Sequence, residues 1–149
     1  MCNCKKNKVE VRFKKIHELA KLPSKNKDSD TGYDVYSIEK VVIPTKGCAN
    51  IKCGLQVAYI TPGYWFSARS RSGLGFKNDI ICFHGTIDNE YRGELGLKLF
   101  NFSDKDYIVN VGDRVCQIAI QENIDSLISF SDDIAETERG SCGFGSSGK

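Results

Sequence analysis

The feature of this sequence that most limits its fold is a series of short, strand-like segments. Each is rich in β-branched or aromatic residues, and several alternate apolar with polar residues, as half-buried strands do. The segments are 9–13, 41–43, 50–60, 64–68, 79–83, 94–102, 107–111 and 114–120. Turn residues such as Thr61-Pro62-Gly63 and Gly112-Asp113 separate them. Many short strands at regular spacing predict an all-β, jelly-roll-like antiparallel barrel or sandwich.

One segment has a different pattern. Residues 14–22, KKIHELAKL, show a weak helical period that Pro23 ends, which predicts a short helix. A chain of 149 residues that is 40% hydrophobic fits one domain with its own core. We expect that β domain to span residues 1–138 and a flexible C-terminal arm to span residues 139–149.

The arm, RGSCGFGSSGK, is rich in glycine and serine and has one large apolar residue, Phe144. Such a segment cannot bury enough surface to offset its ordering entropy, so we expect it to be mobile. Its spelling is close to the P-loop pattern G-x-x-x-x-G-K-[ST], which works only where the loop opens a helix. Here the final Ser or Thr and the helix are both missing, which argues against a fixed phosphate cradle.

The cysteines and the charge distribution indicate the cellular compartment and the kinds of binding partner. Seven cysteines without a secretion signal indicate reduced thiols, and the pairs that could be proposed as zinc ligands, Cys2 with Cys4 and Cys48 with Cys53, have no histidine in a matching context. Nine of the 21 basic residues lie in the first 27, but this lysine-rich start lacks the interleaved aromatics of a single-strand binder. No segment reaches the roughly 18 consecutive apolar residues of a membrane span. We expect an intracellular protein, cytoplasmic or nuclear, with neither a membrane nor nucleic acid as partner.

Arginine placement points to a ligand. Of six arginines, five lie in glycine-rich or acidic segments. These are Arg69, Arg71, Arg92, Arg114 and Arg139. Because the guanidinium fork matches phosphate oxygens, this placement indicates a polyphosphate ligand.

Five segments depart from plain strand-and-turn composition. They are SDTGYDVYS (29–37), SRSGLGFKN (70–78), GTIDNEYRGELG (85–96), GDRVCQ (112–117) and RGSCGFGSSGK (139–149). In this order they resemble the five motifs of the all-β, homotrimeric dUTPase family, which hydrolyses dUTP to dUMP and pyrophosphate. The resemblance implies the same activity, a homotrimer with active sites shared between subunits, and Mg²⁺ as cofactor.

The third motif supplies the chemistry. Asp88, taken alone, is a turn aspartate, whereas the resemblance implies a general base that activates the water attacking the α-phosphate. It also implies that Tyr91 packs on the deoxyribose and excludes a 2′-hydroxyl, and that residues 80–85, ending at Gly85, form a hairpin whose backbone pairs with uracil. His84, like Phe83, stands where the family often has a small residue, and we expect it to neighbour the site without a catalytic role.

The remaining motifs supply phosphate contacts. The segment 70–78, taken alone, is a surface loop with an arginine, hydroxyls and free N–H groups. The resemblance implies that its contacts, together with those of the fourth motif and the arm, come from Arg71, Ser72, Gly73, Gln117 and Arg139. Arg114 is expected to support them with charge. Phe144 would cover the uracil, although Cys142 and Ser147 replace the usual Gly and Thr of the arm.

No cluster of carboxylate, His or Cys residues at ligand spacing marks a metal cage built by the protein. That pattern suits Mg²⁺ held mainly by substrate phosphates and water. For Asp34 two roles stay open: a bond to a neighbouring loop, or, as the resemblance implies, a place near the metal's water shell.

Two alternatives to dUTP hydrolysis remain. A dCTP deaminase, or a bifunctional deaminase and dUTPase, shares the fold, but that group lacks an arm of this type and has a different third motif. A non-catalytic nucleotide-sensing or nucleic-acid-tethering module is the alternative of another class. Such a module would not need Asp88.

Overall fold

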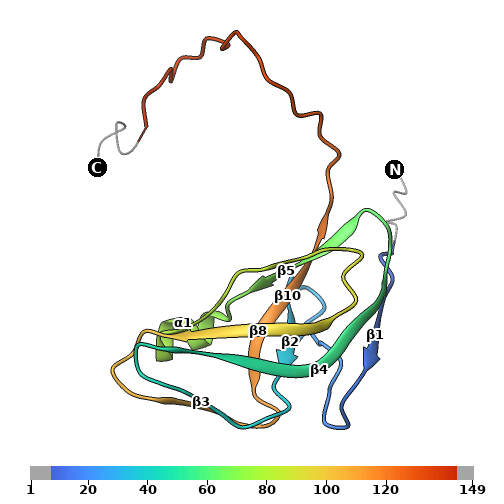
Figure 1. Ribbon diagram of the computed structural model, residues 1–149, viewed down its shortest axis with the longest axis vertical. Helices are drawn as coiled ribbons and strands as arrows, with labels where there is room; N and C mark the ends of the chain where they lie inside the picture. The colour runs from blue at the N-terminus through green and yellow to red at the C-terminus, as the bar shows by residue number, and fades with distance from the viewer. Residues whose placement is uncertain (1–7, 144–149) are drawn as a thin grey trace.

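The computed structural model describes residues 8–143, and within them the chain forms an all-β sandwich (Figure 1). Its elements are β1 (Val11–Lys15), β2 (Tyr33–Tyr36), β3 (Val41–Ile43), β4 (Cys48–Ile60), β5 (Tyr64–Arg69), α1 (Ser72–Asn78), β6 (Ile80–Cys82), β7 (Thr86–Ile87), β8 (Glu94–Asn101), β9 (Tyr107–Val109) and β10 (Arg114–Glu122). Two four-stranded sheets have the orders β1-β4-β8-β6 and β2-β10-β5-β7, and β3 pairs with β9. The strand pairs are antiparallel, which confirms the predicted fold class.

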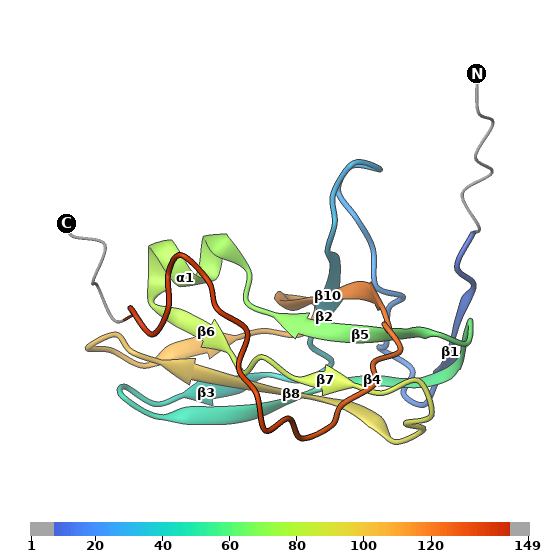
Figure 2. The ribbon, with the colours of Figure 1, turned by 90° about the horizontal axis from the view of Figure 1, so that it is seen from above.

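The core lies between the two larger sheets (Figure 2). Along β8, Leu95, Leu97 and Leu99 are buried while Lys98 points outward, so the period of two is clear. Phe66 of β5 faces them from the other sheet as the largest fully buried side chain. Alternating apolar residues therefore build the sandwich as the sequence predicts.

The predicted helix over residues 14–22 is wrong. β1 continues to Lys15 and pairs with β4, and the Ile16 N–H then donates to the Gly54 carbonyl oxygen at 2.9 Å. The few residues left before Pro23 form turns, because only the small Ala20 among them is buried, which is too little to offset the nucleation cost of a short helix. Pairing with β4 therefore overrides a weak helical propensity.

A helix instead forms in the segment that looked like a loop. α1 begins after Arg71, which has an extended backbone, and is followed by Asp79 in the left-handed conformation, with φ of 55°. Its buried Leu74 anchors it to the core, which outweighs the low helix propensity of its two glycines. No helix within residues 8–143 is long and apolar enough to cross a membrane.

The segment 80–85 does not form one hairpin. β6 ends at Cys82, and the Phe83 N–H makes a last bond to β8 through the Lys98 carbonyl oxygen, at 2.8 Å. The Gly85 carbonyl oxygen then accepts from the Ala68 N–H of β5 at 2.9 Å, and β7 follows in that other sheet. This segment is therefore a crossing between sheets.

β10 leads directly into the C-terminal segment. The Asn123 N–H donates to the Gly63 carbonyl oxygen at 2.7 Å, the final backbone bond to the sandwich within the described residues. Residues 124–142 are exposed and run away from both sheets (Figure 1). Phe144 lies outside the described residues.

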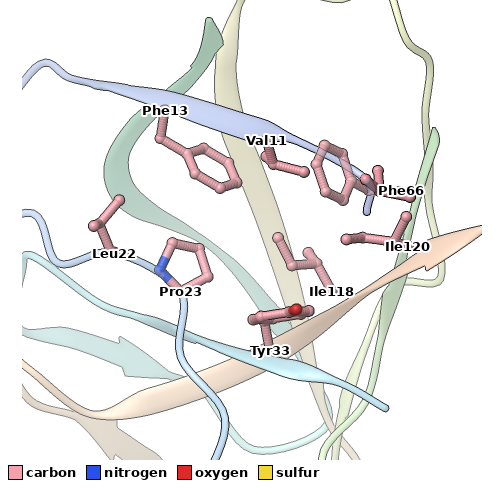
Figure 3. Close-up of a pocket in the computed structure, with 9 residues that line it drawn as sticks. Val11, Phe13, Leu22, Pro23, Tyr33, Phe66, Ile118 and Ile120 are labelled. Carbon is pink, nitrogen blue, oxygen red and sulfur yellow. The ribbon is translucent and has the colours of Figure 1, made fainter. Parts of the chain in front are cut away.

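An apolar groove of about 260 Å³ opens between β1 and the second sheet (Figure 3). Phe13 of β1 and Phe66 of β5 face each other across it, with ring centroids 6.0 Å apart. The groove is lined by Val9, Val11, Phe13, Leu22, Pro23, Tyr33, Phe66, Ile118 and Ile120. None of these is a predicted site residue.

Candidate active site

A polar pocket of about 300 Å³ gathers six of the predicted site residues. They are Asp34, Arg71, Ser72, Gly73, Arg114 and Gln117. They come from β2, the start of α1 and the first part of β10. Figure 2 shows α1 and the loop before β2 rising on the same side of the sheets. The fold thus joins the first, second and fourth motifs in one place.

Asp34 organises this pocket. Arg71 Nε donates to Asp34 Oδ1 at 2.9 Å, and Arg114 Nη1 donates to Oδ2 at 3.2 Å. Arg71 Nη1 also bonds the Arg114 carbonyl oxygen at 2.9 Å. The side chains of Asp34 and Arg71 are only 17% and 22% exposed, so the pair is well shielded. One carboxylate therefore holds two cations in fixed positions beside the pocket.

Gln117 is fixed from two sides. On β10 it stands opposite Asp34 of β2 and Arg69 of β5, and its Nε2 donates to the Ser70 carbonyl oxygen at 2.8 Å. A Cβ at Gly32 would lie 1.9 Å from Gln117 Oε1, so glycine there leaves room for this side chain. Gly32 belongs to the first motif, but composition alone did not single it out.

Sequence reasoning missed two further residues of the pocket. Asn26 and Asp30 line it from the loop before β2, and Asp30 Oδ2 accepts from the Lys27 N–H at 2.9 Å. Asp30 lies inside the first motif but was given no role there, and Asn26 lies outside all five motifs. Their place at the site depends on the path of the loop before β2.

Asp88 lies elsewhere. It borders an opening of about 320 Å³ beside the turn that joins β4 to β5, and within residues 8–143 its carboxylate makes no hydrogen bond. The next residue, Asn89, anchors the turn: its Nδ2 donates to the carbonyl oxygens of Thr61 at 3.1 Å and Tyr64 at 2.8 Å. Asn89, which the sequence analysis did not single out, therefore positions an exposed carboxylate free to bind water.

Gly85 and Tyr91 border an adjoining opening of about 390 Å³. Tyr91 Oη donates to the Glu94 carbonyl oxygen at 2.9 Å. A Cβ at Gly93 would overlap Tyr91 Oη, so the tyrosine ring rests against a glycine. Phe83 lines the same opening, and Tyr91 also borders the space around Asp88.

The predicted residues thus fall into two groups within one chain. The pocket around Asp34 and Arg71 shares no lining residue with the openings around Gly85, Asp88 and Tyr91. Arg139 joins neither group: it is exposed on the arm, and its Nε donates to the Cys142 carbonyl oxygen at 2.8 Å. A single chain does not assemble the whole predicted site.

Two buried thiols lie beneath the pocket. Cys82 Sγ on β6 and Cys116 Sγ on β10 are 3.2 Å apart. The hydrogen bond between the two thiols lowers the pKa of Cys82, while the same contact and burial raise the pKa of Cys116. Within residues 8–143 no three His, Cys, Asp or Glu side chains form a group that could hold a metal ion.

Comparison with known sequences shows the family. The sequence profile of the dUTPase family matches residues 18–148. The deoxyuridine 5′-triphosphate nucleotidohydrolase of Helicobacter pylori is 36% identical over 142 residues, which cover 94% of this chain and 97% of that protein. The mitochondrial protein of the same name from Dictyostelium discoideum is 41% identical over 137 residues, covering 92% of this chain and 76% of that protein.

Solved structures agree. A mutant dUTPase of Staphylococcus bacteriophage 80alpha with dUpNHpp superposes with a TM-score of 0.81 at 27% identity, covering 96% of this chain and 99% of that one. A mutant dUTPase of phage phi11, described with a structural Mg(II) ion, has a TM-score of 0.75 at 28% identity, covering 87% of this chain and 100% of that one. With the profile match over most of its length, the chain belongs to the dUTPase family.

Proposed function

We infer that this protein hydrolyses dUTP to dUMP and pyrophosphate. Family membership over residues 18–148 carries this conclusion, and relatives at 36% and 41% identity are named as dUTP nucleotidohydrolases. The pocket in which Asp34 orders two arginines supports a triphosphate substrate. Deamination of dCTP is not favoured, because none of these comparisons points to a deaminase.

In the proposed mechanism Asp88 orients the water that attacks the α-phosphate. Its exposed carboxylate, without a hydrogen bond inside the described chain, is free to accept one from water. Arg71, Ser72 and Gln117 hold the phosphates and neutralise the charge that develops on the leaving pyrophosphate. Gly73 adds a backbone N–H at the start of α1, and Arg114 supports Arg71 through Asp34.

Gly85 and Tyr91 would select the nucleoside. The backbone of the crossing that ends at Gly85 is not fully paired, and its amides suit the polar edge of uracil. The Tyr91 ring is held by its bond to Glu94, so it can press on the sugar without moving. A rigid ring there excludes a 2′-hydroxyl by sterics.

Mg²⁺ would reach the site with the nucleotide. Asp34 already bonds two arginines and no protein cage exists within residues 8–143, a donor set that fits a cation held by substrate phosphates and water. Asp30 and Asp34 are the carboxylates of the pocket that would face its water shell. Bound there, Mg²⁺ neutralises phosphate charge.

We further propose a homotrimer whose active sites are shared between subunits. The separation of the Arg71 pocket from Asp88 and Tyr91 supports this, since one chain supplies two incomplete halves. The described segment that precedes the arm adds a second argument: Ile124, Leu127, Ile128, Phe130 and Ile134 are at least 80% exposed. So much bare apolar surface is typical of a segment that another chain covers.

The apolar groove of Figure 3 is a suitable receptor for residues 124–134 of a neighbouring subunit, the segment that leads into the arm. It is lined almost entirely by apolar side chains, and two of them, Ile118 and Ile120, lie on the strand that leads into the arm. An arm exchanged in this way would bring Arg139, and Phe144 beyond the described residues, over a site of another chain. The arm boundary at residue 139 is part of this proposal.

The activity is tested by incubating the protein and Mg²⁺ separately with dUTP, dCTP, dTTP and UTP while pyrophosphate and ammonia are measured. We expect pyrophosphate from dUTP alone. Asp88→Asn should retain nucleotide binding and lower kcat by about 10²- to 10⁴-fold. Ammonia from dCTP, or a wild-type kcat for Asp88→Asn, would refute the mechanism.

Sharing of sites is tested by mixing two inactive variants. Asp88→Asn and Arg71→Ala chains are unfolded, combined in equal amounts and refolded, with refolded wild type as the control. If each site takes Asp88 from one chain and Arg71 from another, about a quarter of the sites receive both intact halves. Activity should return to about that fraction of wild type, and no recovery would place the site within one chain.

A further inference from the structure

Ser70 lies at the junction of three elements that hold the candidate site. It directly precedes Arg71, and its carbonyl oxygen accepts from Gln117 Nε2 at 2.8 Å. Its hydroxyl accepts from the Cys82 N–H at 3.0 Å and donates to the Cys82 carbonyl oxygen at 3.2 Å. Ser70 thus links the segment around Arg71 to β6 through its half-buried side chain and to β10 through its backbone carbonyl.

The Ser70 hydroxyl makes the hydrogen bonds to β6 that a neighbouring strand would otherwise make. β6 is an end strand of its sheet, so one side of its backbone has no strand partner. Ser70 bonds both the N–H and the C=O that Cys82 presents on that side, using the donor and acceptor of one hydroxyl. On its other side β6 is paired with β8 and is therefore fixed. β6 thus anchors Ser70, and through Ser70 it holds the segment from Ser70 to Gly73 in place.

His84 adds a second contact to the same residue. Its Nε2 lies 3.4 Å from both the backbone nitrogen and the hydroxyl oxygen of Ser70. An unprotonated Nε2 accepts from the Ser70 N–H, and a protonated Nε2 donates to Oγ, so either tautomer finds a partner. At this length each bond is weaker than those to Cys82.

We propose that Ser70, assisted by His84, is a positioning residue for triphosphate binding. It holds Arg71 and Ser72 in register with Gln117, so that all three meet the phosphates together. This inference rests on the proposed function, because it assigns those residues to the substrate. It gives His84 a role in orienting the loop, which the sequence did not predict.

The main test compares two ligands by equilibrium titration: a non-hydrolysable imido analogue of dUTP, and dUMP, which lacks the two outer phosphates. Ser70→Ala should weaken binding of the analogue about tenfold, the effect of losing a well-formed, partly buried hydrogen bond. Affinity for dUMP should stay within about twofold, since β6 and β8 keep the crossing in place. With Mg²⁺ and dUTP, KM should rise more than kcat falls.

Conservative variants separate positioning from general damage. Ser70→Thr keeps the hydroxyl and should restore analogue affinity, while Ser70→Cys, a weak hydrogen-bonding isostere, should fall between Ser and Ala. Ser67→Ala is the matched control, because the Ser67 hydroxyl bonds only the exposed Arg69 side chain within the described residues. It should bind both ligands as wild type does.

The role of His84 is tested in the same assay. His84→Ala should weaken binding of the analogue about threefold, because the bonds of His84 to Ser70 are long. His84→Gln should restore the affinity by presenting an amide near the place of Nε2. In the Ser70→Ala background His84→Ala should have a smaller effect than alone, and full additivity would remove His84 from the proposal. His17→Gln, at the other histidine, is the control.

Two results would overturn the inference. One is an unchanged affinity of Ser70→Ala for the analogue. The other is an equal loss for the analogue and dUMP, which would indicate a general loss of fold. Failure of the wild type to hydrolyse dUTP would instead refute the proposed function, so the two failures are distinguishable.

Discussion

The phosphate pocket and the C-terminal arm are joined by one strand, β10, yet they are held in opposite ways. Gln117, early in β10, has a strand on each side and a side-chain bond to Ser70. Beyond Asn123, at the end of the strand, the described chain keeps only local hydrogen bonds and its side chains are exposed. Two regions a few residues apart thus differ completely in tertiary support.

This contrast separates what one chain prepares from what assembly or ligand must add. The pocket holds its charged groups in place before substrate arrives, so little entropy is lost when phosphates bind. The arm gains order only when another surface covers it, and that cost is met at binding. We therefore expect pocket variants to change affinity, variants of residues 124–134 to change assembly, and loss of the arm at residues 139–149 to change turnover.

The largest effect should come from removing the arm. A chain that ends at Glu138 should still form trimers but lose about 100-fold or more in kcat/KM, because a phosphate contact and a cover against water are both lost. Steady-state kinetics and light scattering measure the two properties. Glu138→Ala, next to the deletion, should be unaffected, and undiminished turnover of the shortened chain would show that the arm is not a lid.

The next effect concerns assembly. Leu127→Ser combined with Phe130→Ser should weaken the trimer, because burying each of these side chains is worth about 1.5–3 kcal/mol. Sedimentation over a range of protein concentrations would measure the dissociation. Ile108→Ser, at a half-exposed position on β9, is the comparison variant. Equal trimer stability for the double variant and the wild type would mean that no partner chain buries Leu127 and Phe130.

A smaller change is expected from the centre of the pocket. Asp34→Asn keeps the shape but removes the charge that orients Arg71 and Arg114, and kcat/KM for dUTP should fall about tenfold, as for loss of one shielded charged bond. Asp104→Asn is the control, since its pair with Lys46 is fully exposed and should be worth little. If both substitutions have the same effect, the orientation of Arg71 is not set by Asp34.

The smallest effect is on thiol reactivity. Cys142 on the exposed arm should react quickly with iodoacetamide and several-fold more slowly once the imido analogue is bound, as the arm closes. Cys53 should react slowly throughout, because burial raises its pKa to about 11. Mass spectrometry of the labelled peptides resolves the sites. Equal Cys142 labelling with and without nucleotide would count against closure.

Local patterns predicted much of the sandwich. The predicted segment 41–43 coincides with β3, and 50–60 falls within β4, because alternation and β-branched residues are legible at short range. The helix predicted over 14–22 failed because its competitor, pairing with β4, lies far along the chain. α1 was missed for a related reason, since its anchor is the burial of Leu74 against distant strands.

The candidate site shows the same division. The five motifs identified Asp88 and Arg71 by resemblance, but not the anchors Asn89 and Ser70, whose bonds run to carbonyl groups of other elements. Asn26 and Asp30 joined the pocket only through the path of a loop. Residues that act through a partner have no signature of their own type or spacing.

The sequence by itself therefore determined the strand series, the all-β class and the family, because periodicity and motif order depend only on the order of residues along the chain. Only the tertiary structure decided which charges meet. Asp34 and Arg114 are 80 residues apart, and Asp34 and Arg71 are 37 apart. Their contact, and the separation of both from Asp88, depend on which strands pair across the sandwich, a long-range choice that no local pattern encodes.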